Sequence, residues 1–131
     1  MTHVRSPLLR GLIAIDAVAC AASGALLAFA AEPLATITGL APDLTRPAGV
    51  FLLAWTLVLA TAASRPTLSR AAVWTLIAVN VIWVVESALV LLLGWAQPTA
   101  AGYGFVIAQA VAVAAIAELQ FVALRRAATV A

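Results

Sequence analysis

Residues 71–94 read AAVWTLIAVNVIWVVESALVLLLG, an apolar run in which Glu86 is the only charged residue. The hydrocarbon core of a bilayer is about 30 Å thick and needs about 20 apolar residues of helix to cross it. A helix also satisfies its own backbone polar groups in lipid. Three further stretches of this kind occupy residues 8–31, 47–63 and 101–124. The sequence therefore predicts an all-α, multi-pass membrane protein, folded as a four-helix bundle in one transmembrane domain over residues 1–131.

Composition supports this class of protein. Hydrophobic residues make up 66% of the chain and charged residues 9%, whereas a soluble domain carries about 25% charged residues. Every basic residue other than His3 is an arginine, and alanine is abundant, as a GC-rich bacterial genome would produce. We therefore expect a location in a bacterial inner (plasma) membrane.

The arginines are distributed unevenly between the two sides of the predicted membrane domain. Only Arg46 falls in the first loop, which spans residues 32–46 and is expected to be the longest. Cytoplasmic loops carry an excess of arginine and lysine, so both termini are predicted to be cytoplasmic. The partners expected there are anionic lipid headgroups rather than nucleic acid. The arginines on this side are Arg5, Arg10, Arg65, Arg70, Arg125 and Arg126.

A weak internal similarity relates the two halves of the chain. Residues 13–18, IAIDAV, align with residues 77–82, IAVNVI, and the match places Asp16 and Asn80 at equivalent positions. One interpretation is a pair of parallel helical hairpins related by an axis along the membrane normal. The alternative is chance, because segments rich in alanine and valine match one another easily.

Polar residues within the apolar stretches are where any chemistry has to be sought. A carboxylate at the centre of a membrane helix costs about 2.5–3.5 kcal/mol on insertion scales, so such a residue is expected to face the bundle interior. The candidate intramembrane polar site consists of Asp16, Asn80, Glu86, Gln109 and Glu118.

Distance along the helices predicts two polar layers, at a rise of 1.5 Å per residue. Asp16, Asn80 and Glu118 belong to a layer on the cytoplasmic side, and Glu86 and Gln109 to an outer layer. On the last helix, Gln109 and Gln120 share one face and Glu118 lies on nearly the opposite face. This split suggests that one face meets another protomer or a partner chain.

Two interpretations remain open for the carboxylates. Asp16 and Glu86 either couple protons or cations to transport or form buried hydrogen bonds that fix helix register. For Glu118 we favour a structural role, in which it pairs with Arg10 or Arg125 near the interface.

Small residues on the first helix predict a surface for close helix packing, since small-xxx-small spacing lets membrane helices approach one another. These residues are Ala17, Ala21, Gly24 and Ala28. The only histidine is His3 and the only cysteine is Cys20. No metal site or cofactor is expected, and no catalytic set is visible.

Three short motifs resemble DoxX-type small four-helix membrane proteins: LLRG at residues 8–11, GLAP at 39–42 and AGV at 48–50. The similarity would cover most of the chain and implies the same four-helix architecture. Trp55 and the absence of an acidic residue from the second helix depart from the glutamate often found there. No functional residue is carried over from this resemblance.

Three functions follow as hypotheses. The leading one is a non-enzymatic accessory or interaction subunit, acting as a homo-oligomer or with a partner membrane protein. The second is a dimeric, proton-coupled transporter of small solutes that uses buried carboxylates. The third is a lipid- or isoprenoid-handling membrane enzyme, which would need an aqueous entrance leading to Glu86 or Glu118.

Overall fold

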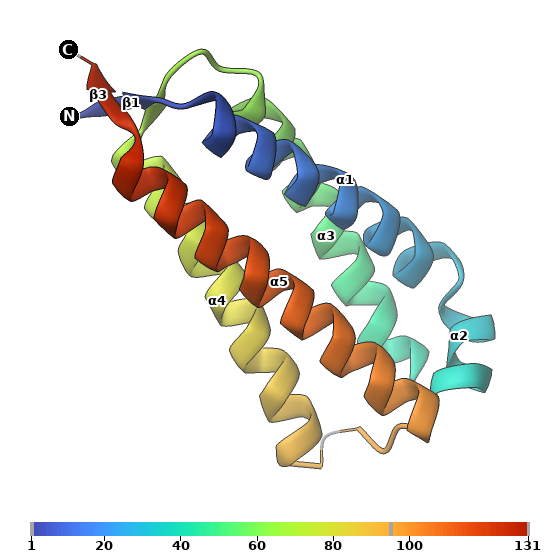
Figure 1. The fold of residues 1–131 in the computed structure, drawn as a ribbon. Helices are drawn as coiled ribbons and strands as arrows, with labels where there is room; N and C mark the ends of the chain where they lie inside the picture. Colours follow the sequence, from blue (N-terminus) through green and yellow to red (C-terminus); the bar gives the residue numbers. More distant parts are fainter. Residues whose placement is uncertain (1, 95, 131) are drawn as a thin grey trace.

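The computed structural model describes residues 2–94 and 96–130. Four long helices lie side by side, with a short helix at one end and a small sheet at the other (Figure 1). The long helices are α1 (Pro7–Phe29), α3 (Pro42–Ala63), α4 (Arg70–Leu92) and α5 (Ala100–Arg126), and the short helix is α2 (Ala31–Thr38). Each long helix is long and apolar enough to cross a membrane. The prediction of an all-α chain with four membrane-length helices is confirmed.

Hydroxyl side chains start three of the long helices. Ser6, Ser69 and Thr99 precede α1, α4 and α5, and each accepts a hydrogen bond from the backbone N–H three residues later, at 3.0 to 3.1 Å. Such caps satisfy N–H groups that have no partner within the helix. The residue just before each of these helices therefore helps to determine where the helix begins.

The region predicted as a long loop, residues 32–46, is mostly helical. α2 occupies its first half and ends at Gly39, whose φ of 73° is the left-handed conformation that closes many helices. α3 then begins at Pro42 rather than at Pro47, so Pro47 lies inside the helix. The predicted start at residue 47 was wrong because Pro42 also suits a first helical turn. Trp95, which we expected near the interface, lies outside the described residues.

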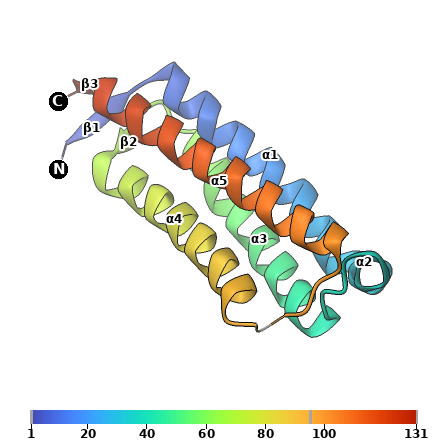
Figure 2. The same cartoon turned by 60° about the horizontal axis from the view of Figure 1, so that its bottom comes forward.

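A three-stranded antiparallel sheet, absent from the sequence prediction, joins the two ends of the chain. Its strands are β1 (His3–Arg5), β2 (Leu68–Ser69) and β3 (Ala128–Val130), in the order β2-β1-β3. Both termini consequently lie side by side at the same end of the molecule (Figures 1 and 2). Every arginine except Arg46 is in or next to this end.

The helices form two pairs. α1 packs most closely against α3, and α4 against α5. The α1–α3 contact is made by glycine: a Cβ added to Gly49 would overlap the backbone of Ala28 and lie 2.8 Å from the carbonyl oxygen of Gly24. Gly24 and Ala28, two of the residues expected to mediate packing, therefore face α3. Of Ala17 and Ala21, the former is buried and the latter is half-buried.

The contact between the pairs runs mainly through α1 and α5. A short connection, residues 64–69, joins α3 to α4. Within the described residues they are not among the closely packed helix pairs. Instead, the Phe51 ring of α3 stacks on the Trp83 ring of α4, with centroids 6.1 Å apart.

Bulky side chains are most completely buried at the end that holds the termini. The largest fully buried side chains all lie there: Val4, Leu9, Ile13, Leu59, Val73, Gln120 and Leu124. Toward the opposite end the two helix pairs enclose a cavity. The molecule therefore has one filled half and one hollow half.

Candidate functional site

Three helices meet in a ring of polar side chains at the boundary between the two halves. Asp16 of α1, Asn80 of α4 and Gln120 of α5 are 2%, 5% and 0% exposed. Asn80 Nδ2 donates to Asp16 Oδ2 at 3.0 Å, and Gln120 Nε2 donates to the same oxygen at 3.2 Å. Asn80 Nδ2 also donates to Gln120 Oε1 at 3.2 Å, which closes the ring.

The other oxygen of Asp16 has a weaker partner. Cys20, one turn further along α1, places its Sγ 3.6 Å from Asp16 Oδ1. Asp16 is the acceptor in each of these contacts. Amide dipoles supply all the stabilisation, because no arginine contributes to the ring. We refer to Asp16, Asn80 and Gln120 below as the polar ring.

Above the polar ring lies a cavity of about 250 Å³ between the two helix pairs. Its lining runs along α1 from Asp16 to Leu27 and along α5 from Phe105 to Ile116. At 1.5 Å per residue, either span corresponds to about 16 Å. The cavity is thus elongated along the helices, with a carboxylate at one end.

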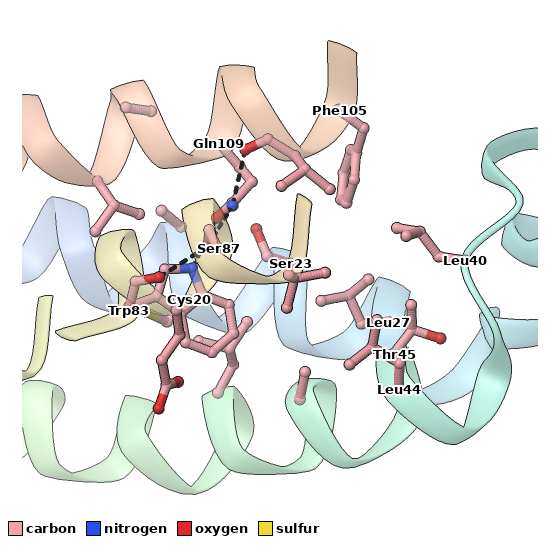
Figure 3. A pocket seen from close by; sticks show the side chains of 18 of the residues that line it. Cys20, Ser23, Leu27, Leu40, Leu44, Thr45, Trp83, Ser87, Phe105 and Gln109 are labelled. Atoms are coloured by element: carbon pink, nitrogen blue, oxygen red, sulfur yellow. Dashed lines mark hydrogen bonds between the residues drawn. The ribbon is translucent and has the colours of Figure 1, made fainter. Parts of the chain in front are cut away.

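Figure 3 shows how the two ends of this cavity differ. Leu40 and Leu44, which follow α2 in the chain, lie at the end remote from the termini, and Cys20 and Trp83 lie toward the polar ring. Most of the lining in between is aliphatic. The cavity therefore suits an occupant with an apolar body.

A second polar group lies partway along the cavity wall. Trp83 Nε1 of α4 donates to Gln109 Oε1 of α5 at 2.7 Å, and Gln109 Nε2 donates to Ser87 Oγ at 3.0 Å (Figure 3). Gln109 Nε2 also donates to the carbonyl oxygen of Val106 at 2.9 Å. These bonds join α4 to α5 and fix the Trp83 indole in the wall.

The structure brings together some of the predicted site residues and separates others. Asp16 and Asn80 are in direct contact, and Gln109 belongs to the second polar group. Glu86 lines the cavity and is exposed. Glu118 is exposed on α5 and is not part of the cavity lining.

The polar ring includes a residue that was not among the predicted site residues. Gln120, and not Glu118, completes the ring with Asp16 and Asn80. The sequence did contain the signal, because Gln120 follows Gln109 by three helical turns and shares its inward face.

Two arginines that were expected to meet lipid headgroups also hold the helix ends. Arg10 donates from Nε and Nη2 to the carbonyl oxygen of Ala63 at 3.2 and 3.1 Å. Arg70 donates to the carbonyl oxygen of Leu124 at 3.4 Å. Arginine side chains at a helix C-terminus donate hydrogen bonds to carbonyl groups that have no partner within the helix. Their positive charge also interacts favourably with the negative end of the helix dipole.

Ion pairs and metal-binding clusters are scarce in the described ranges. The salt bridge found there, between Arg46 and Glu32 at 3.7 Å, is exposed, and neither residue belongs to the cavity lining. No group of three or more potential metal ligands occurs among residues 2–94 and 96–130. The chemistry of the site is therefore that of carboxylates, amides and one indole facing an apolar space.

Comparison with family models, characterised protein sequences and solved structures finds no match. The resemblance to DoxX-type proteins accordingly stays a prediction, carried by the motifs that suggested it.

Proposed function

We propose that this chain is a membrane protein that binds a small, largely apolar molecule in the cavity between its two helix pairs. The observation that carries this proposal is the cavity itself, about 250 Å³ in volume and bounded at one end by the polar ring. Pockets for drug-sized ligands span about 300–1,000 Å³. The expected ligand is therefore smaller than a typical drug.

The free-energy cost of leaving this cavity empty supports the proposal that a ligand fills it. Residual cavities enclosed in protein cores cost about 24 cal/mol per Å³, so about 6 kcal/mol is an upper bound for leaving this partly open space empty. Membrane helices gain little from the hydrophobic effect when they associate in lipid and depend on packing and hydrogen bonds. A ligand that fills the space would restore the missing van der Waals contacts.

The leading sequence hypothesis, an accessory or interaction subunit, remains a second candidate because of Glu118. This carboxylate is exposed on the face of α5 that points away from the cavity. Charged residues in membrane helices normally face a protein interior or a partner. A partner protein or second copy that covers Glu118 is compatible with ligand binding in the cavity.

Proton-coupled transport would use the same binding site and would require more than binding. Asp16 and Glu86 both line the cavity, as a carrier that exchanges protons for cargo would require. Transport additionally demands a second conformation in which the cavity faces the other side. We propose binding as the basal function and make no step depend on transport.

The proposal is tested with bromobenzene, an uncharged probe whose heavy atom quenches tryptophan fluorescence on contact. In a variant that keeps Trp83 as its only tryptophan, quenching should be saturable, because Trp83 lines the cavity. The added change Ala112→Phe, which projects into the lining, should abolish saturation. Ala114→Phe is the matched control, since Ala114 is exposed like Ala112 but is not part of the cavity lining.

Non-saturable quenching that is equal in both phenylalanine variants would mean that the probe reaches Trp83 only from the bilayer. That result would refute a binding cavity.

A further inference from the structure

Acidic but not basic side chains occur among the described residues that line the cavity. Asp16 and Glu86 line it from α1 and α4, and none of the described residues in its lining is arginine, lysine or histidine. Six residues separate Glu86 from Asn80 of the polar ring, which places Glu86 about 9 Å further along the cavity. One carboxylate thus lies at the closed end and the other partway along the wall.

The basic residues of the chain are placed elsewhere. Arg10 and Arg70 donate to backbone carbonyl groups at the end that holds the termini, and Arg46 pairs with Glu32 near the other end. Within the described part of the chain, neither Asp16 nor Glu86 takes part in a salt bridge. The protein itself provides these cavity carboxylates with no counter-ion.

We propose that the ligand of this cavity is a small lipophilic cation, an organic ammonium with a short hydrocarbon body, whose charge lies between Asp16 and Glu86. This inference rests on the proposed binding function and adds the ligand's charge to it. Interactions between charges are stronger in a medium of low dielectric constant than in water. A cationic ligand would therefore gain most in the part of the cavity where the carboxylates are.

The rest of the lining fits the same ligand. Trp83 and Phe105 line the cavity, and aromatic faces attract ammonium groups through their quadrupoles. The bonds from Gln109 hold the Trp83 ring in place. Aliphatic side chains such as Leu27 and Ile116 line the remaining space, where a hydrocarbon body is favoured over a second charge.

Asp16 has acceptor capacity left for such a ligand. A carboxylate offers about four lone-pair sites. Oδ2 accepts two amide N–H groups, whereas Oδ1 has only the weak Cys20 contact at 3.6 Å. An ammonium N–H donor could thus bind Oδ1 without displacing the bonds of the polar ring.

The test compares n-octylamine, which is a cation at pH 7, with 1-octanol, a neutral molecule of nearly the same size. Binding is measured by equilibrium dialysis against protein in nanodiscs of zwitterionic lipid, with empty nanodiscs subtracted. The wild-type chain should bind octylamine at least about tenfold more tightly than octanol. Glu86→Gln should reduce octylamine affinity about tenfold and leave octanol affinity unchanged.

Glu118→Gln is the matched control, because it removes the same charge from a membrane helix outside the cavity lining. It should bind octylamine like the wild-type chain. Asp16→Asn should also lower octylamine affinity, but it alters the polar ring. Glu86 carries the decisive comparison because it is exposed and makes no side-chain hydrogen bond or salt bridge among the described residues.

Each alternative result overturns a specific claim. Equal affinity for octylamine and octanol, with saturable bromobenzene quenching, would refute the cationic ligand and leave the binding cavity intact. Equal losses in Glu86→Gln and Glu118→Gln would show a general charge effect and would refute the site. If neither amphiphile binds and bromobenzene quenching is not saturable, the proposed binding function fails as well.

Discussion

At the scale of single residues, Asp16 is the side chain that organises the membrane interior. It accepts hydrogen bonds from Asn80 of α4 and Gln120 of α5 and so links the α1–α3 pair to the α4–α5 pair. Interhelical hydrogen bonds in membranes contribute about 0.6 kcal/mol on average and up to about 1.7 kcal/mol each. The polar ring therefore contributes to holding the two helix pairs together, whether or not Asp16 also binds a ligand.

Replacement of Asp16 by asparagine should destabilise this junction. The new amide offers one acceptor oxygen in place of two and adds an N–H₂ group near the donors of Asn80 and Gln120. With two interhelical bonds affected, we expect a loss of about 1–3 kcal/mol in the free energy of unfolding, measured in bicelles by steric trapping.

Cys20→Ala is the comparison for that measurement, because it removes only the 3.6 Å thiol contact. It should change stability by less than about 1 kcal/mol, as expected for a weak donor. Comparable losses in the two variants would contradict the assignment of the main stabilisation to the amides.

At the scale of helices, the two pairs are held together by different means. α1 and α3 approach through Gly24 and Gly49, where an added Cβ would meet backbone atoms. α4 and α5 are joined by polar side chains, with Gln109 bonded to Trp83 and Ser87. Hydrophobic burial cannot distinguish these interfaces in lipid, so small residues and hydrogen bonds specify them.

Gly49→Ala should separate α1 from α3. The new Cβ would overlap the backbone of Ala28. Overpacking of this kind lowers the free energy of unfolding by about 1–3 kcal/mol. Gly104→Ala is the control, since a Cβ there meets nothing within 4 Å. It should be neutral or stabilising by up to about 1 kcal/mol, because alanine favours helix. Thermal unfolding in detergent checks both, and equal midpoints for the two variants would contradict the glycine contact.

The sequence predicts the helices better than it predicts their connections. Hydropathy identifies four spans because each needs about 20 apolar residues. It does not identify α2, since Pro33 and Gly39 suggest a loop, and Pro33 is tolerated within the first turn of a helix. The sheet was also missed, because its strands have two or three residues and pair across most of the chain.

Part of the candidate site was predictable from the sequence. The repeat alignment matched Asp16 with Asn80, and these residues are in contact. Residues that meet their own equivalents would lie on an axis between two related hairpins, so the contact is compatible with the proposed repeat. Gln120 was missed although the sequence places it on the same helix face as Gln109. The cavity was not predicted, since its volume depends on how far the helix pairs separate.

At the scale of the whole molecule, charge and packing are both asymmetric along the helices. One end holds the sheet, both termini and the filled core, and every arginine except Arg46 is in or next to it. The other end holds α2, and the cavity extends toward it between the helix pairs. The positive-inside rule predicts that the arginine-rich end is cytoplasmic, and on that prediction the cavity extends toward the outer side.

Cysteine labelling in bacterial cells checks this orientation. In a Cys20→Ala background, Gln97→Cys in the exposed α4–α5 connection should react with a membrane-impermeant maleimide in intact spheroplasts. Arg65→Cys, exposed in the α3–α4 turn, should react only after permeabilisation. The reverse pattern would contradict the predicted orientation while leaving the fold unchanged.

The central claim is that the hollow half of the molecule binds a small apolar ligand. The most direct measurement is anomalous diffraction at the bromine edge from crystals grown in a lipidic phase and soaked with bromobenzene. The account predicts a bromine peak between the helix pairs, next to Trp83 and within the lining formed by Leu27 and Val113. Peaks only on the outer, lipid-facing surfaces of the helices would contradict it.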